Sequence, residues 1–220
     1  MKLEFMKKAE QSKQTYGKMM LALGIGLLVS ICVSIMTGFT SDCAQIRESV
    51  LRLHILANSD TAEDQALKIK VRDRILEETG DLFVCDGSVE DAKQQAEEHL
   101  DDITRIAEEE IRKQGYDYSV KAELCNMFFE TRQYEQFSLP AGRYDALRIT
   151  IGAAEGHNWW CVLYPPLCLP AAMPEEELKN ANLTQEQTQI IEQPQEYKVE
   201  FAVVELWEKL KNTFSDTAKK

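Results

Sequence analysis

Histidine is scarce in this sequence, which holds only His54, His99 and His157 among its 220 residues. Few side chains can therefore serve as the base of a hydrolytic triad. The chain also lacks the GxxxxGK(S/T), GxGxxG, GxSxG and HExxH motifs of phosphate loops, dinucleotide-binding folds, α/β-hydrolases and zinc proteases. We therefore predict no catalytic residues, no cofactor and no metal ion.

Basic residues are also few, with 25 Lys and Arg against 37 Asp and Glu, a net charge of −12. Such an acidic chain lacks the positive surface that neutralises nucleic-acid phosphates, so we expect no nucleic-acid partner. The six cysteines are irregularly spaced, which excludes a disulfide-dense scaffold. A composition of 44% hydrophobic and 28% charged residues is typical of a globular protein.

The N-terminal segment has the opposite charge to the rest. Residues 1–18 carry five lysines against two glutamates, and no charged residue occurs from Met19 to Ser41. A helix over Met19–Phe39 is about 31 Å long, enough to cross a bilayer with its basic flank in the cytoplasm. We predict a basic cytoplasmic tail (1–18), a membrane-spanning or signal segment (19–41) and an extracytoplasmic domain (42–220). The segment ends without an A-x-A site, which favours an uncleaved anchor, with cleavage as the alternative.

The exported part begins with a predicted strand over Ser49–Ala57, since Leu51, Leu53 and Ile55 alternate with Arg52 and His54. Residues 58–61 (Asn-Ser-Asp-Thr) supply turn and cap chemistry for a helix that we expect to end near Glu78, before Gly80. Ser88 is expected to cap one longer helix that reaches about Lys113.

Three further strands are predicted at Tyr118–Glu130, Tyr144–Ile151 and Trp159–Leu163, with the last two forming a hairpin. Residues 174–196 are polar and read as a surface excursion with a helix capped at Thr184. A last strand at Val199–Glu205 and a short helix at Trp207–Phe214 complete the pattern. The predicted fold is α+β, a mostly antiparallel sheet with packed helices.

Two adjacent tryptophans mark the candidate binding surface. On a strand Trp159 and Trp160 must point to opposite faces, and an exposed Trp is a typical interface anchor. We therefore expect partner contact through Asn158, Trp159, Trp160, Pro165, Pro166 and Leu167, with His54, Asn58, Ser59 and Asp60 beside them. Capping alone is an equal explanation for the loop residues. Cys161 and Cys168 are close enough in sequence for a disulfide, and two free thiols are the alternative.

Four stretches resemble the stage II sporulation protein R family. They are Arg52–Asp60 with Glu63–Asp73, Leu139–Arg148, Asn158–Cys168 and Val203–Glu208, and together they cover residues of about 47–211. The resemblance implies a protein exported across the forespore membrane into the space between the two membranes. There the family triggers a membrane-embedded aspartic protease, which removes the pro-sequence of the early mother-cell sigma factor. It implies a signalling protein, with no small-molecule substrate.

Two other functions remain open from the residues. An extracytoplasmic hydrolase acting on cell-wall or peptide material would use His54 as its base, with Ser59 and Asp60 nearby. A structural anchor of the envelope is the third hypothesis, and it predicts no dependence on a protease.

Overall fold

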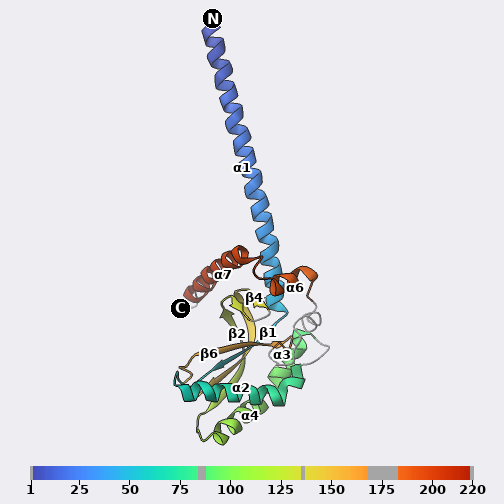
Figure 1. Ribbon diagram of the computed structural model, residues 1–220, viewed down its shortest axis with the longest axis vertical. Helices are drawn as coiled ribbons and strands as arrows, with labels where there is room; N and C mark the ends of the chain where they lie inside the picture. The colour runs from blue at the N-terminus through green and yellow to red at the C-terminus, as the bar shows by residue number, and fades with distance from the viewer. Residues whose placement is uncertain (1, 84–87, 135–136, 168–182, 219–220) are drawn as a thin grey trace. The chain divides into compact units, whose positions relative to one another are not determined.

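A computed structural model describes residues 2–83, 88–134, 137–167 and 183–218, with the backbone alone for 2–15, 81 and 215–218. Its helices are α1 (Lys2–Glu48), α2 (Ala62–Phe83), α3 (Val89–Glu98), α4 (Leu100–Lys113), α6 (Gln185–Glu192) and α7 (Lys198–Ala218). Its strands are β1 (Leu51–Leu56), β2 (Val120–Phe129), β3 (Arg132–Gln133), β4 (Ser138–Leu139), β5 (Gly142–Ile151) and β6 (Asn158–Tyr164) (Figure 1).

The chain divides into two compact units, Met1–Ser41 and Asp42–Lys220. Helix α1 contains the uncharged run, and its part from Tyr16 to Glu48 is long and apolar enough to cross a membrane, with a mean hydropathy of 2.5. None of that apolar window is buried. An N-terminal membrane or signal helix is therefore part of the fold.

Four strands of the second unit form a mixed sheet in the order β2-β5-β1-β6. β1 pairs parallel to β5 and antiparallel to β6, and β2 pairs antiparallel to β5. The predicted hairpin of Tyr144–Ile151 with Trp159–Leu163 is wrong, because β1 lies between these strands. The α+β class is confirmed, with two antiparallel pairings and one parallel pairing in this sheet.

One face of the sheet carries the hydrophobic core. Leu53 and Ile55 of β1 pair with Leu147 and Ile149 of β5, and all four are fully buried. The buried stripes of α2 and α4 cover this face, and Figure 1 shows these two helices together on one side of the strands. Each fully buried Leu or Ile contributes roughly 1.5–3 kcal/mol of hydrophobic stabilisation.

The helix boundaries differ from the prediction in two places. Ser88 forms the expected capping box, with Asp91, but the predicted long helix ends at Glu98 and α4 starts again after His99. Helix α2 also continues past Gly80 to Phe83. Phe83 is 1% exposed, so its burial in the core outweighs the helix-breaking tendency of the glycine.

The predicted strand at Val199–Glu205 is wrong, since these residues belong to α7, as do Trp207–Phe214. Phe201 and Val204 are buried while Val199 and Val203 are exposed. The separation of three between the buried residues follows the helical repeat rather than the alternation of a strand.

The polar excursion contains the predicted capped helix. The Thr184 hydroxyl accepts a hydrogen bond from the Gln187 backbone amide, and the Gln187 side-chain oxygen accepts one from the Thr184 backbone amide. Ile190 and Ile191 of this helix, α6, are buried. The first part of the excursion, residues 174–182, lies outside the described residues.

Replacing leucine by alanine at two sites on β1 should lower the free energy of unfolding by different amounts. Leu53 is fully buried on the helix-covered face, so Leu53→Ala should lower the free energy of unfolding by about 2–5 kcal/mol. Leu56→Ala is the matched control, because Leu56 is only half-buried and should cost clearly less. Urea unfolding of the full chain in detergent micelles, followed by tryptophan fluorescence, measures both. Equal losses would contradict the assigned core.

Candidate functional site

The two tryptophans of β6 lie on opposite faces of the sheet, as predicted. Trp159 packs at the edge of the helix-covered core, and the Arg72 guanidinium of α2 lies 4.3 Å from its ring centroid. Trp160 lies on the other face, beside the β1 side chains that point away from the core. Both rings are half-buried, so neither is a freely exposed anchor.

Trp160 is the centre of an aromatic cluster on the second face. Its ring stacks on His54 with centroids 4.0 Å apart and an interplanar angle of 8°. Phe129 of β2 meets it edge-on at 4.7 Å. His54 Nε2 lies 2.8 Å from Oδ1 of Asn158, and this oxygen can only accept, so Nε2 donates. We call Trp160, His54, Asn158, Phe129 and Arg52 the Trp160 cluster.

Arg52 is the unusual member of the cluster, since its side chain is fully buried. Its guanidinium carbon lies 4.0 Å from the Phe129 ring centroid and 4.9 Å from that of Tyr144. Nη2 donates to the Tyr134 hydroxyl at 2.6 Å. Nε and Nη1 have no hydrogen-bond partner among the described residues. No ion pair of Arg52 is found among the described residues, and a buried charge without a counter-charge is costly, so such a group is suited to receive an anion.

Arg52 also contributes to the lining of a cavity of about 170 Å³. Its lining consists of Arg52, Phe128, Phe129, Glu130, Arg132 and Trp160. Glu130 shares Lys209 with Glu205, at 2.8 and 2.9 Å, and the two arginines of the lining outnumber this one glutamate. The space exceeds that of a few water molecules and is wide enough for a carboxylate side chain. The cavity is therefore cationic and aromatic.

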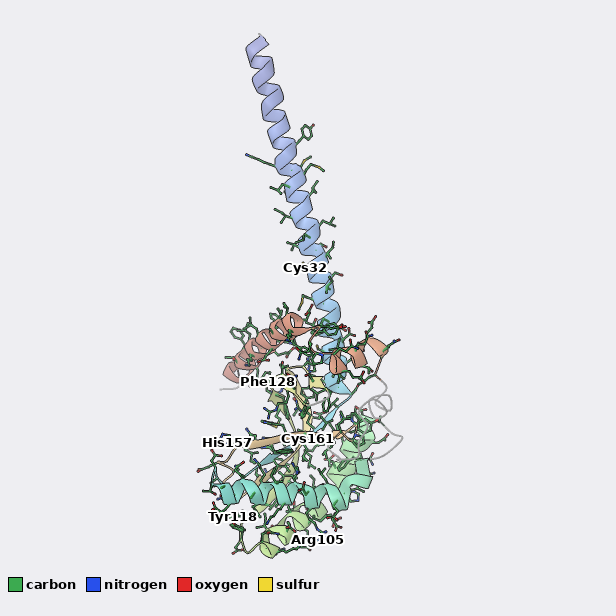
Figure 2. The ribbon with its side chains drawn as sticks, viewed as in Figure 1. Cys32, Arg105, Tyr118, Phe128, His157 and Cys161 are labelled. Atoms are coloured by element: carbon green, nitrogen blue, oxygen red, sulfur yellow. The ribbon has the colours of Figure 1, made fainter. Side chains whose placement is uncertain are left out.

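The predicted loop residues gather in a second group, at the start of α2. Asn58 Nδ2 and Ser59 Oγ both donate to Asp64, at 2.8 and 2.5 Å, and these bonds lower the pKa of Asp64. Asp60 accepts from the backbone and the ring of His157. Figure 2 shows His157 at the same end of the domain as Tyr118, which also bonds Asp64.

This turn has a structural role. Asn58 Oδ1 accepts from the Ala153 amide at 2.9 Å, which ties the β1–α2 turn to the β5–β6 connection. The bonds also separate the three residues of the hydrolase hypothesis. His54 binds Asn158, Ser59 binds Asp64, and Asp60 binds His157. They do not form a Ser-His-Asp relay.

The remaining predicted contact residues are less accessible than expected. Pro165 and Pro166 are buried, Leu167 is half-buried and Asn158 is exposed. Cys161 is disulfide-bonded, while Cys168 lies outside the described residues, so their pairing stays a prediction. Among the described residues, no three His, Cys, Asp or Glu side chains are grouped to hold a metal ion.

Sequence reasoning placed Arg52 on the correct face but gave it no function. Phe128, Phe129 and Arg132 were missed as well, since they lie about 80 residues from Arg52 in the sequence. The available signal was the charged residue inside the apolar strand Leu51–Leu56. A charge at a central strand position requires a partner that the strand alone does not supply.

His54 gives this site a predicted pH signature. The pKa of His54 is lowered to about 4, mainly by burial and also by the nearby Arg148 and Arg52, while the hydrogen bond with Asn158 opposes the shift. The unfolded chain binds a proton at this histidine below pH of about 6.5, and the folded chain does not until pH of about 4. Between these values the group removes about 1.4 kcal/mol of stability per pH unit as pH falls.

We expect His54→Phe to flatten the loss of stability between pH 6 and 4.5 by about this slope. Urea unfolding of both full-length proteins in micelles at several pH values measures the difference. The two curves should run parallel above pH of about 7.5, where His54 is neutral in both states. Parallel curves at acidic pH would show that His54 titrates normally.

The comparisons with known proteins agree on one family. The family model described as stage II sporulation protein R (spore_II_R) matches residues 47–174. The stage II sporulation protein R of Bacillus subtilis (strain 168) is 38% identical over 145 residues, which is 64% of this chain and 65% of that relative. No solved structure matches. This chain belongs to the stage II sporulation protein R family.

Proposed function

We propose that this chain is an exported signalling protein that activates a membrane-embedded aspartic protease during sporulation. The protease then removes the pro-sequence of the early mother-cell sigma factor. Family membership supports the role in sporulation, and the apolar helix α1 supports export or anchoring. In this proposal the chain crosses the forespore membrane and acts from the intermembrane space.

The observation that carries the proposal is the buried Arg52, which lines the cavity beside Trp160 and whose Nε and Nη1 have no hydrogen-bond partner among the described residues. Such a pocket is built to bind a group rather than to transform one, since His54 is held by Asn158 and Trp160. An acidic side chain on the exposed surface of the protease would enter the cavity, where the charges of Arg52 and Arg132 would attract it. Because Nε and Nη1 of Arg52 are buried, direct bonds to them would require a small side-chain movement at the cavity. The aromatic rings of Phe129 and Trp160 would exclude water from that pair.

In this proposal the chain binds the active state of the protease more tightly than the inactive state. A ligand shifts an enzyme toward its active state by as much as its affinities for the two states differ. The cost of desolvating Arg52 is already met in the folded domain, so the partner has to desolvate only its own carboxylate. The chain itself performs no chemistry in this scheme.

The test is co-expression of this chain, the protease and a tagged sigma-factor precursor in a non-sporulating host, with cleavage followed by blotting. Arg52→Met keeps the packing of the side chain but removes its charge. Loss of one partner of a buried charge pair costs about 2–5 kcal/mol, so cleavage should fall at least about tenfold. Trp160→Ala removes one wall of the cavity and should also lower cleavage.

Arg72→Met is the matched control. Arg72 also lies over a tryptophan, but on the helix-covered face, so this variant should signal normally. If the Arg52→Met and Trp160→Ala variants fold and are exported, and the sigma-factor precursor is still fully cleaved, the pocket has no part in the proposed activation. If wild-type chain is exported beside the protease and no cleavage occurs, the activating role itself is wrong.

A further inference from the structure

We propose that the outer face of α7 lies in the headgroup region of the membrane from which the domain emerges. The inference rests on the proposed retention of the chain in that membrane through α1, and it is independent of the protease. It gives the domain a second attachment to the lipid and hence a fixed orientation on the membrane surface.

An apolar stripe on α7 is the first observation. Val199, Val203, Leu206, Trp207, Leu210 and Phe214 are 45–73% exposed. Their spacing of three or four residues places them along one side of the helix. In the described part of the domain from Asp42 onward, all exposed large hydrophobic side chains lie on this helix. A stripe of six exposed apolar side chains on a protein surface usually marks contact with an apolar partner.

The inner side of α7 is already occupied, so the stripe faces away from the domain. Phe201 and Val204 are buried. Glu208 forms an ion pair with Arg47 at 3.6 Å, and both side chains are only 12% exposed. Asn212 accepts a hydrogen bond from Arg143 at 2.8 Å. These contacts hold the helix on the domain with its apolar side outward.

The length of chain between the uncharged run and the contacts of α7 is short. The uncharged run ends at Ser41, while Cys43 and Ile46 are already fully buried in the domain. Arg47, the partner of Glu208, also donates to the Ala141 carbonyl at 3.1 Å. Even a fully extended chain covers only about 20 Å from Ser41 to Arg47. This short connection limits how far Arg47, and with it the Glu208 position of α7, can lie from the end of the uncharged run.

The side chains fit the interfacial layer. Trp is enriched at the headgroup level, where Trp207 would lie. Lys211, whose Nζ lies 5.8 Å from the Trp207 ring centroid, is paired with Glu208 at 2.6 Å, so its charge is compensated within the helix. The helix carries three lysines against four acidic residues, and the domain is acidic. Attraction to anionic lipid therefore contributes little, and the apolar stripe itself should provide the binding.

Fluorescence of the full chain tests this directly. The chain is reconstituted as one copy per nanodisc, in phosphatidylcholine with or without bromine near the headgroup. Comparison with the Trp207→Phe variant separates the fluorescence of Trp207 from that of Trp159 and Trp160. We expect brominated lipid to quench the Trp207 contribution by about twofold or more, and the other two much less.

Two variants make the test specific. Leu206→Ser with Leu210→Ser should abolish the quenching of Trp207, although α1 keeps the protein in the disc. Glu97→Ser with Asp101→Ser is the matched control on exposed positions of α3 and α4, and should leave quenching unchanged. Circular dichroism checks that both variants fold.

If brominated lipid does not quench Trp207 in discs that hold one copy, and Trp207 is exposed to water, the inference is wrong. So would protection of Trp207 that appears only when two copies share a disc, since the stripe would then be an interface between copies. Quenching does not depend on the protease. Loss of sigma-factor cleavage with quenching intact would therefore contradict the proposed function alone.

Discussion

The insertion of β1 between β5 and β6 determines most of what this domain can do. β1 takes its hydrogen bonds from both neighbours, parallel on one side and antiparallel on the other. Its register places His54 against Trp160 and Arg52 within reach of the β2 residue Phe129. Had β5 and β6 paired directly, this cluster would not exist. The turn at Asn58, bonded to the connection between those strands, holds the arrangement in place.

The two faces of this central strand have opposite energetic roles. Leu53 and Ile55 bury apolar surface under α2 and α4 and stabilise the fold. Arg52 and His54 are also buried, but each carries a cost. Arg52 has no ion-pair partner among the described residues, and the pKa of His54 is lowered. Local choices that oppose stability are expected at functional sites. The helix-covered face supplies the stability that the Trp160 cluster lacks.

Local signals in the sequence were reliable where one segment decides its own structure. The uncharged run before Ser41, the caps at Ser88 and Thr184, and the alternation of β1 all follow from neighbouring residues. The errors occurred where tertiary contacts decide. Seven residues from Val199 fit a strand or a helix equally well, and only the burial of Phe201 and Val204 distinguishes them. Strand order is likewise a long-range property.

The sequence by itself therefore determined an acidic α+β domain behind an apolar N-terminal helix, because composition, charge and short-range periodicity are properties of contiguous residues. It also placed Arg52 and His54 on one face of a strand. Only the tertiary structure decided that this face meets Trp160 and Phe129 around a cavity, and that α7 presents its apolar stripe outward. Those features depend on contacts between residues about 80 to 160 positions apart, which local physical preferences do not specify.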